Sequence, residues 1–191
     1  MHDMTLKIEA AVDPESRMEA LAHIERSMRE KFGCEPPPTT GLAFVARAGG
    51  RIVGSLVIEG ASGNGPLPIE THYAFDEARS PYPYVRHDIV QATRWTASVP
   101  EASRLVVLAT MRAAFHLGKR LMLIEAKPYA IARLAELGMD FREIEGAEVL
   151  LETVRESVGP EGMKYFTDAP APSLYLCDMG EALRTSGSWD A

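Results

Sequence analysis

The chain has little cysteine, no long apolar run and no excess of positive charge. Its two cysteines, Cys34 and Cys177, lie far apart and form no C-x-x-C pair, which excludes a dense disulfide framework and a Cys-rich zinc site. No apolar run approaches the roughly 20 residues of a membrane-spanning helix. A net charge of -7 argues against a nucleic-acid partner or an anionic membrane surface. We expect free thiols in a reducing compartment.

The N-terminal stretch MHDMTLKIEAAVDPESR lacks the basic segment and apolar run of a secretory signal peptide, so we expect a cytoplasmic protein. The chain has 191 residues, 46% of them hydrophobic, which suffices for one sizeable core without disulfides or metals. We find no internal repeat and no linker. The expectation is one mixed α/β domain over residues 1–191, with a loose tail at about 184–191.

Apolar periodicity predicts alternating strands and helices along the chain. The expected helices span residues 14–33, 101–117 and 128–137, and the expected strands span 5–10, 42–48, 51–59, 89–99, 121–126, 141–144, 147–154 and 173–177. The two apolar runs around Gly49-Gly50 are the clearest hairpin signal. Asp13-Pro14 is typical of a helix start, because Asp caps free N–H groups and Pro fits the first turn.

The stretch IVQATRWTASVP, residues 89–100, has strand-like β-branched and aromatic content, yet it carries an amide, a guanidinium and hydroxyls. Side chains alternate along a strand, so we expect Thr93 and Arg94 on opposite faces. Such polar groups suit a strand that faces a ligand. Arg94 either anchors a substrate carboxylate, braces polar groups that line a site, or forms a salt bridge over a sheet edge.

The element order, with LAFVARAGGRIVGSLVIEG as a hairpin and PYAIARLAELGMDF after a short central strand, resembles the GNAT acyltransferase superfamily. Within it, QATRW, LPIETHYAFDE and APAPSLYLCDMGEAL resemble the acyl-homoserine lactone (autoinducer) synthases and the N-acyl amino acid synthases. The resemblance covers roughly residues 42–178. It implies a mixed central sheet of about seven strands, flanked by helices. Its fourth and fifth strands splay apart around the pantetheine arm of a thioester donor.

Two features depart from the superfamily pattern. The segment SVPEASRLVVLAT has no glycine, whereas ordinary GNAT acetyltransferases bind pyrophosphate through a glycine-rich loop at this helix start. Position 91 is Gln, whereas the autoinducer synthases have Glu.

The resemblance implies an acyl-CoA or acyl carrier protein (acyl-ACP) donor, no metal, and a small-molecule amine acceptor such as an amino acid or S-adenosylmethionine. The protein is expected to be a monomer or a homodimer. Two alternatives stay open: an ordinary acetyl-CoA-dependent N-acetyltransferase, and a catalytically degenerate protein that binds a ligand without turnover.

Acyl transfer from a thioester to an amine needs a base for the ammonium, donors for the thioester oxygen and a proton for the leaving thiolate. Gln91 cannot act as the base, so its expected role is to orient a partner or donate a hydrogen bond. Candidate bases are Glu70, His72, His87 and Asp88, acting directly or through a water. His87-Asp88 at the strand start suits a base because a histidine titrates near neutrality, but a surface histidine at a strand end is the more frequent explanation, and Glu70 is equally open.

Substrate contacts are expected from the same strand, at Thr93, Trp95, Thr96, Ala97 and Ser98. The backbone of residues 95–97 is expected to supply the oxyanion donors, if a bulge aims them. Trp95 either lines an acyl pocket or fills the core.

Donor contacts are expected from the helices that follow. Arg104, Arg112 and Lys119 fall within a narrow arc of the predicted helix, where they form either a docking stripe for acyl carrier protein and pantetheine phosphate or an ordinary solvated face. Arg104 and Tyr129 are the expected donor-binding residues.

Overall fold

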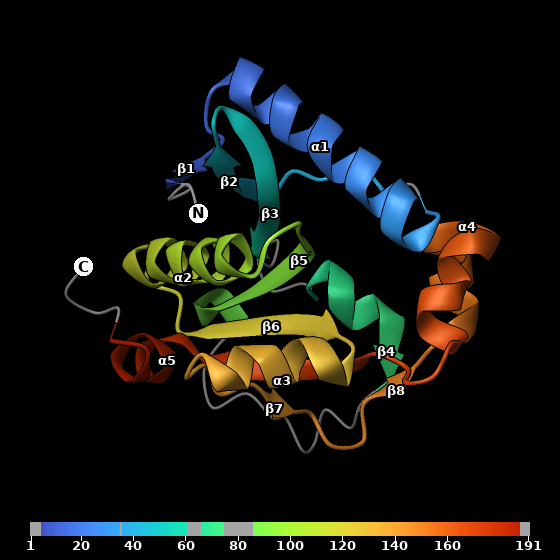
Figure 1. Ribbon diagram of the computed structural model, residues 1–191. Coiled ribbons are helices and arrows are strands. Elements are labelled where there is room, and N and C mark those ends of the chain that lie inside the picture. Colours follow the sequence, from blue (N-terminus) through green and yellow to red (C-terminus); the bar gives the residue numbers. More distant parts are fainter. Residues whose placement is uncertain (1–4, 35, 61–65, 75–85, 188–191) are drawn as a thin grey trace.

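The computed structural model describes residues 5–34, 36–60, 66–74 and 86–187. The α-helices within these ranges are α1 (Pro14–Phe32), α2 (Pro100–His116), α3 (Pro128–Glu136), α4 (Leu151–Thr167) and α5 (Met179–Thr185). The strands are β1 (Leu6–Ala10), β2 (Leu42–Ala48), β3 (Arg51–Gly60), β4 (Tyr73–Ala74), β5 (Ile89–Ala97), β6 (Leu121–Ala126), β7 (Arg142–Glu143), β8 (Glu148–Val149) and β9 (Ser173–Asp178). Short 3-10 helices, η1 (Pro68–His72) and η3 (Arg86–Asp88), precede β4 and β5 (Figure 1).

Seven strands form one mixed sheet in the order β1-β2-β3-β5-β6-β9-β7. Only β5 and β6 pair in parallel; the other neighbours in this sheet are antiparallel. The predicted mixed sheet of about seven strands is therefore confirmed, and so is the hairpin of β2 and β3. Gly49 and Gly50 form its turn with φ of 54° and 82°, a left-handed conformation that glycine adopts without steric cost.

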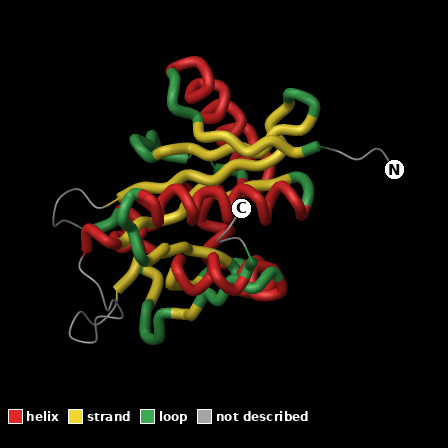
Figure 2. Tube along the Cα trace, turned by 90° about the vertical axis from the view of Figure 1, so that its left-hand side faces the viewer, coloured by secondary structure: helices red, strands yellow, loops and turns green. Residues whose placement is uncertain are grey.

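Helices cover both faces of this sheet (Figure 2). The principal core lies between one face and the helices α2, α3 and α5, and it includes Val106, Met111 and Met122. On the opposite face, α1 packs against β2 and β3 through Ile24 and its neighbours. The segment of η1 and β4 covers that same face farther along, over β5, β6 and β9.

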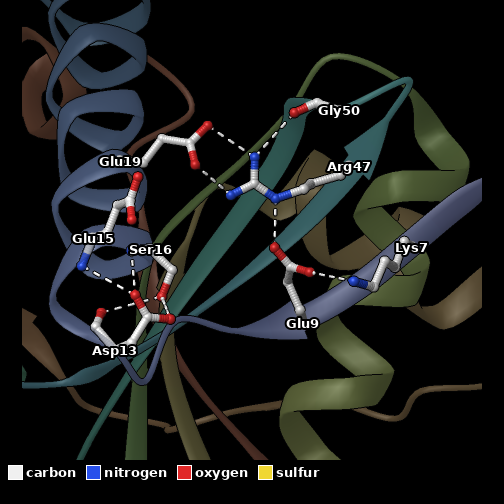
Figure 3. A network of polar contacts seen from close by, with 8 residues as sticks. All are labelled: Lys7, Glu9, Asp13, Glu15, Ser16, Glu19, Arg47 and Gly50. Atoms are coloured by element: carbon white, nitrogen blue, oxygen red, sulfur yellow. Dashed lines mark hydrogen bonds and ion pairs between the residues drawn. The ribbon is translucent and has the colours of Figure 1, made fainter.

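A network of polar contacts fixes α1 against the edge of the sheet (Figure 3). Asp13 caps the helix, and its carboxylate accepts hydrogen bonds from two N–H groups of the first turn at 3.1 and 2.9 Å. Arg47 of β2 donates to Glu9 of β1 at 2.5 Å and to Glu19 of α1 at 2.8 and 2.5 Å. Hydrogen bonds from this guanidinium lower the pKa of both carboxyls. The N-terminal part of α1 is thereby held in place over the sheet.

The predicted strand at 147–154 is wrong. Only β8 (Glu148–Val149) is extended there, and α4 begins at Leu151. The helix was missed because Gly159-Pro160 reads as a helix stop, since proline lacks a donor and clashes with the preceding turn. In the structure Gly159 has φ 69° and ψ 176°, so two helical pieces meet at a kink.

The predicted loose tail is wrong at its start, because residues 184 and 185 belong to α5. Asp178 caps this helix by accepting a hydrogen bond from the N–H of Glu181 at 3.0 Å. Residues 188–191 lie outside the described ranges.

The two cysteines are buried free thiols, as expected. In the part of the chain that the structure describes, no helix is both long and apolar enough to cross a membrane.

Candidate functional site

Strands β5 and β6 pair over four residues and then separate. Their parallel register runs from Ile89–Leu121 to Ala92–Ile124, and no further pair joins the remaining described residues of the two strands. β5 nevertheless continues to Ala97. These are the fourth and fifth of the expected strands, residues 89–99 and 121–126. The splay predicted between them is therefore present.

A β-bulge lies on β5 where the separation begins. In the register with β3, Arg94 and Trp95 together stand opposite Leu56 alone, the two-against-one pattern of a bulge. Arg94 has φ 54° and is the one non-glycine residue with positive φ within the described ranges. This conformation costs an L-residue roughly 1–2 kcal/mol. The bulge interrupts side-chain alternation, so Thr93 and Arg94 both line one cavity, contrary to the expectation of opposite faces.

The cavity occupies the gap between the diverging strands and has a volume of about 760 Å³, within the range of ligand-binding pockets. Its wall combines residues 91–100, the end of β6 with the start of α3, the C-terminal end of α1, and α4. Figure 1 shows α4 beside the end of α1. Phe32 and Tyr165 join these two helices through edge-to-face rings with centroids 5.2 Å apart.

Most of the predicted site residues line this cavity: Gln91, Thr93, Arg94, Trp95, Thr96, Ala97, Ser98 and Tyr129. Trp95 packs partly against the principal core as well, so it combines the two roles that the sequence left open.

Six predicted residues lie outside the cavity wall: Glu70, His87, Asp88, Arg104, Arg112 and Lys119. Glu70 is buried beside it, where its carboxylate accepts from the N–H of Leu67 at 2.6 Å and pairs with Arg86. It therefore caps η1 and has a guanidinium partner.

His87 and Arg104 face away from the cavity. The His87 side chain is 77% exposed and pairs with Asp88 at 2.8 Å, and Arg104 pairs with Glu101 of its own helix at 3.0 Å. The predicted basic stripe is also shorter than expected, because α2 ends at His116 and Lys119 lies beyond it.

Glu59 of β3, which the sequence analysis missed, organises the polar part of the cavity wall. Its carboxylate accepts hydrogen bonds from Gln91 Nε2 at 2.6 Å, from Arg94 Nη1 at 3.4 Å and from the Thr39 hydroxyl. The Glu59 and Arg94 side chains are 12% and 8% exposed, so this is a largely buried ion pair.

The other ends of these two donors are also held. Gln91 Oε1 accepts from the N–H of Ile69 at 2.7 Å, and Arg94 Nη2 donates to the carbonyl of Pro37 at 2.9 Å. Of the roles considered for Arg94, the structure places it as a brace between β5, β3 and the segment after α1.

Glu125, near the end of β6, is a second acidic residue of the wall that sequence reasoning missed. Its side chain is 16% exposed, and Oε2 is buried without a hydrogen-bond partner. The nearest imidazole atom, His72 Nδ1, lies 4.0 Å away. Burial raises the pKa of Glu125 to about 7. The available signal was a single carboxylate in the otherwise apolar strand LMLIEA.

The surroundings of Glu125 are poor in charge. Burial lowers the pKa of His72, which favours its neutral form, and the buried Tyr73 hydroxyl is the uncharged donor beside the Glu125 carboxyl. Trp95 Nε1, elsewhere on the wall, is a buried donor without a partner. Buried polar atoms are normally satisfied, so unpaired ones in a cavity wall are typical of a ligand site.

The start of α2 is unfavourable for an anion. Pro100 lacks an N–H donor, and Glu101 places a carboxylate in the first turn, where it opposes a phosphate near the positive end of the helix dipole. Within the described ranges, no three His, Cys, Asp or Glu side chains are grouped so that they could hold a metal ion.

Comparison with protein-family models and with curated protein sequences finds no match. Solved structures do match. FeeM, an N-acyl amino acid synthase from uncultured soil microbes, is 14% identical, with a TM-score of 0.63 over 96% of both chains. LasI, an acyl-homoserine lactone (AHL) synthase, is 9% identical, with a TM-score of 0.62 over 96% of both chains. An acetyltransferase of the GNAT family from Staphylococcus aureus Mu50 is 8% identical, with a TM-score of 0.53 over 92% of this chain and 99% of that one. At such identities the likeness shows the fold: it is GNAT-like, and the neighbours include the branch that the sequence resembles.

Proposed function

We propose that this protein is an N-acyltransferase that moves an acyl group from a phosphopantetheine thioester to the amine of a small molecule, as autoinducer synthases do. The observation that carries the proposal is the cavity between β5 and β6, which opens where their pairing stops after Ala92. A gap between parallel strands suits a slender, extended ligand that enters along a strand.

The exposed side of β5 supports a pantetheine arm in this gap. Backbone groups of a strand that has lost its neighbour need other partners, and a ligand with amides can supply them as an added strand does. Lys31 of α1 already contacts this segment, because its Nζ donates to the carbonyl of Ala97 at 3.0 Å. The bulge at Arg94 and Trp95 turns the strand at the same point, and we propose its backbone N–H groups as donors to the thioester oxygen.

The start of α2 favours recognition of the donor through its pantetheine arm over recognition through the pyrophosphate of CoA. Pro100 and Glu101 stand where a glycine-rich phosphate loop would be required. We therefore propose that acyl-ACP and acyl-CoA both remain suitable carriers, with Tyr129 at the cavity wall as a pantetheine contact. The acceptor is an amine of the size of an amino acid or S-adenosylmethionine.

A protein that binds such ligands without turnover is the second candidate. Gln91 favours it, because this amide is bonded on both sides to Glu59 and Ile69 and cannot accept a proton from an ammonium.

The test is to incubate the protein with acetyl, octanoyl and palmitoyl thioesters of CoA and of acyl carrier protein, together with amino acids or S-adenosylmethionine. Mass spectrometry should detect a new amide. An Ala130→Phe variant fills the cavity wall and should lose the product, whereas Ala132→Phe, on the exposed side of α3, should keep it. Ligand binding without any amide would favour the second candidate. Equal activity of the two variants would exclude this cavity as the site.

A further inference from the structure

Three carboxylates lie in or beside the cavity wall, and two of them are paired with guanidinium groups. Glu59 contacts Arg94 at 3.4 Å, and Glu70 is paired with Arg86. Each of these two carboxylates already has a cation as its partner. Glu125 differs: within the described ranges no lysine or arginine pairs with it, and the side-chain donor that lowers its pKa is the uncharged Tyr73 hydroxyl.

The groups that face Glu125 come from three elements, and none brings a fixed positive charge. They are His72 of η1, at 4.0 Å, Tyr73 of β4 and Tyr165 of α4. Burial, together with the charge of Glu125, raises the pKa of both tyrosines. His72 Nε2 lies 2.8 Å from the Ser157 hydroxyl, which itself donates to helix carbonyls at 3.1 and 3.0 Å. Either atom of this pair can be the donor, depending on the tautomer of the imidazole.

We infer that Glu125 is the catalytic base of this site, the group that takes a proton from the ammonium of the acceptor. The inference rests on the proposed function, since it assigns the proton acceptor for that reaction. Its basis is the position of the side chain in the cavity wall, its burial and the absence of a lysine or arginine beside it among the described residues.

The step balances as follows. The Glu125 carboxylate removes one proton from the ammonium, and the free amine nitrogen attacks the thioester carbonyl carbon. The C–N bond forms and the C–S bond breaks, and the electron pair of the C–S bond leaves on sulfur. The second proton of the attacking nitrogen goes to the thiolate, giving the thiol. The proton on Glu125 then passes to solvent, so that one amide, one thiol and one proton are released per thioester.

Burial supports this assignment, because it raises the pKa of Glu125 to about 7. A general base is most effective when its pKa lies near the working pH. A carboxyl with its ordinary pKa of 4.5 would be ionised at neutral pH but would be a much weaker base.

The experiment compares Glu125→Gln with the wild type and with Glu143→Gln, which removes an exposed carboxylate from β7 of the same sheet. Octanoyl-CoA and the amine panel serve as probes. We expect kcat/KM of the wild type to rise with pH through about 7. Glu125→Gln should lower kcat by about 100-fold or more and abolish that rise, with octanoyl-CoA binding retained, while Glu143→Gln should match the wild type. Wild-type activity with an unchanged pH profile in Glu125→Gln would overturn the inference.

A second readout keeps the inference testable without turnover. In protein carrying 13C-carboxyl glutamate, one resonance absent from Glu125→Gln should titrate near pH 7. Titration near 4.5 overturns the assignment of a base, whatever the activity. If the wild type forms no amide with any donor, the proposed function and the catalytic role both fail, even when the resonance titrates near 7.

Discussion

Gln91 of β5 donates a hydrogen bond to Glu59 of β3, with 2.6 Å between its Nε2 and the carboxylate oxygen. The two residues are direct cross-strand partners in the β3–β5 register. One amide and one carboxylate thus share a buried position of the cavity wall. The amide at position 91, which departs from the autoinducer-synthase pattern, has a structural counterpart: the carboxylate stands on the neighbouring strand instead.

Gln91→Glu should destabilise the protein. It would place a second carboxylate against Glu59, and two like charges in a buried site cannot both ionise. We expect the free energy of unfolding in urea to fall by roughly 2 kcal/mol at pH 8, and by less at pH 5, where one carboxyl can be protonated.

The matched control is the double variant Glu59→Gln/Gln91→Glu, which exchanges the two groups. The exchanged pair keeps one donor and one acceptor at the same place, so part of the lost stability should return; the rest stays lost because Glu59→Gln also removes the carboxylate that pairs with Arg94. If the double variant is as unstable as Gln91→Glu alone, the contact between these side chains does not explain the loss.

The bulge predicts a difference between two substitutions of Arg94. Both Arg94→Ala and Arg94→Gly remove the guanidinium from Glu59 and Pro37, a loss of roughly 1.5–3 kcal/mol for a hydrogen-bonded charged group. Because φ at this position is 54°, glycine should be more stable than alanine by about 1 kcal/mol. Urea unfolding of both variants measures the difference; alanine equal to or above glycine would contradict the left-handed conformation.

Glu125→Gln should stabilise the protein at alkaline pH. The native pKa of about 7 lies above the ordinary 4.5, so the native state binds more protons than the unfolded state between these values. Stability contributed by the protonated carboxyl is therefore full below about 4.5 and is lost as pH rises through about 7. The difference corresponds to roughly 3 kcal/mol.

Thermal and urea unfolding at pH 4.5 and pH 8 test this pH dependence. Glutamine mimics the protonated acid, so Glu125→Gln should match the wild type at pH 4.5 and exceed it at pH 8. An equal stability difference at both pH values would show that Glu125 keeps an ordinary pKa.

Gly162 of α4 lies where this helix closely approaches the segment after α1. A Cβ atom at this position would lie 2.8 Å from the Val158 side chain and 3.0 Å from Cβ of Cys34. Gly162→Val should therefore cost roughly 1–3 kcal/mol through overpacking. Gly60→Val is the control, because a Cβ there meets nothing within 4 Å. Equal melting temperatures of the two variants would contradict the close contact.

The sequence predicted the elements whose own chemistry defines them. Asp13-Pro14 marks the start of α1 and Gly49-Gly50 the β2–β3 turn, because cap and turn residues act locally. It did not predict α4, since Gly159-Pro160 ordinarily ends a helix; here the pieces on either side of it share the apolar cluster of Val154, Met163 and Phe166.

The candidate site was likewise predicted only where local residues define it. The polar stretch from Gln91 to Ser98 stands out within a strand, so its place on the cavity wall could be expected. Glu59 could not be assigned, because its partner Gln91 lies 32 residues away in the sequence. Glu125 could not be assigned, because its importance depends on the lack of a positively charged partner among the described residues. Neither relationship leaves a local pattern.

The four residue pairs between β5 and β6 have a mechanical consequence. They form the seam between two parts of the sheet, β1-β2-β3-β5 and β6-β9-β7, each of which keeps its own ladder of hydrogen bonds. A small rotation of one part relative to the other would change the width of the gap between β5 and β6, and the hydrogen bonds within each part would stay intact.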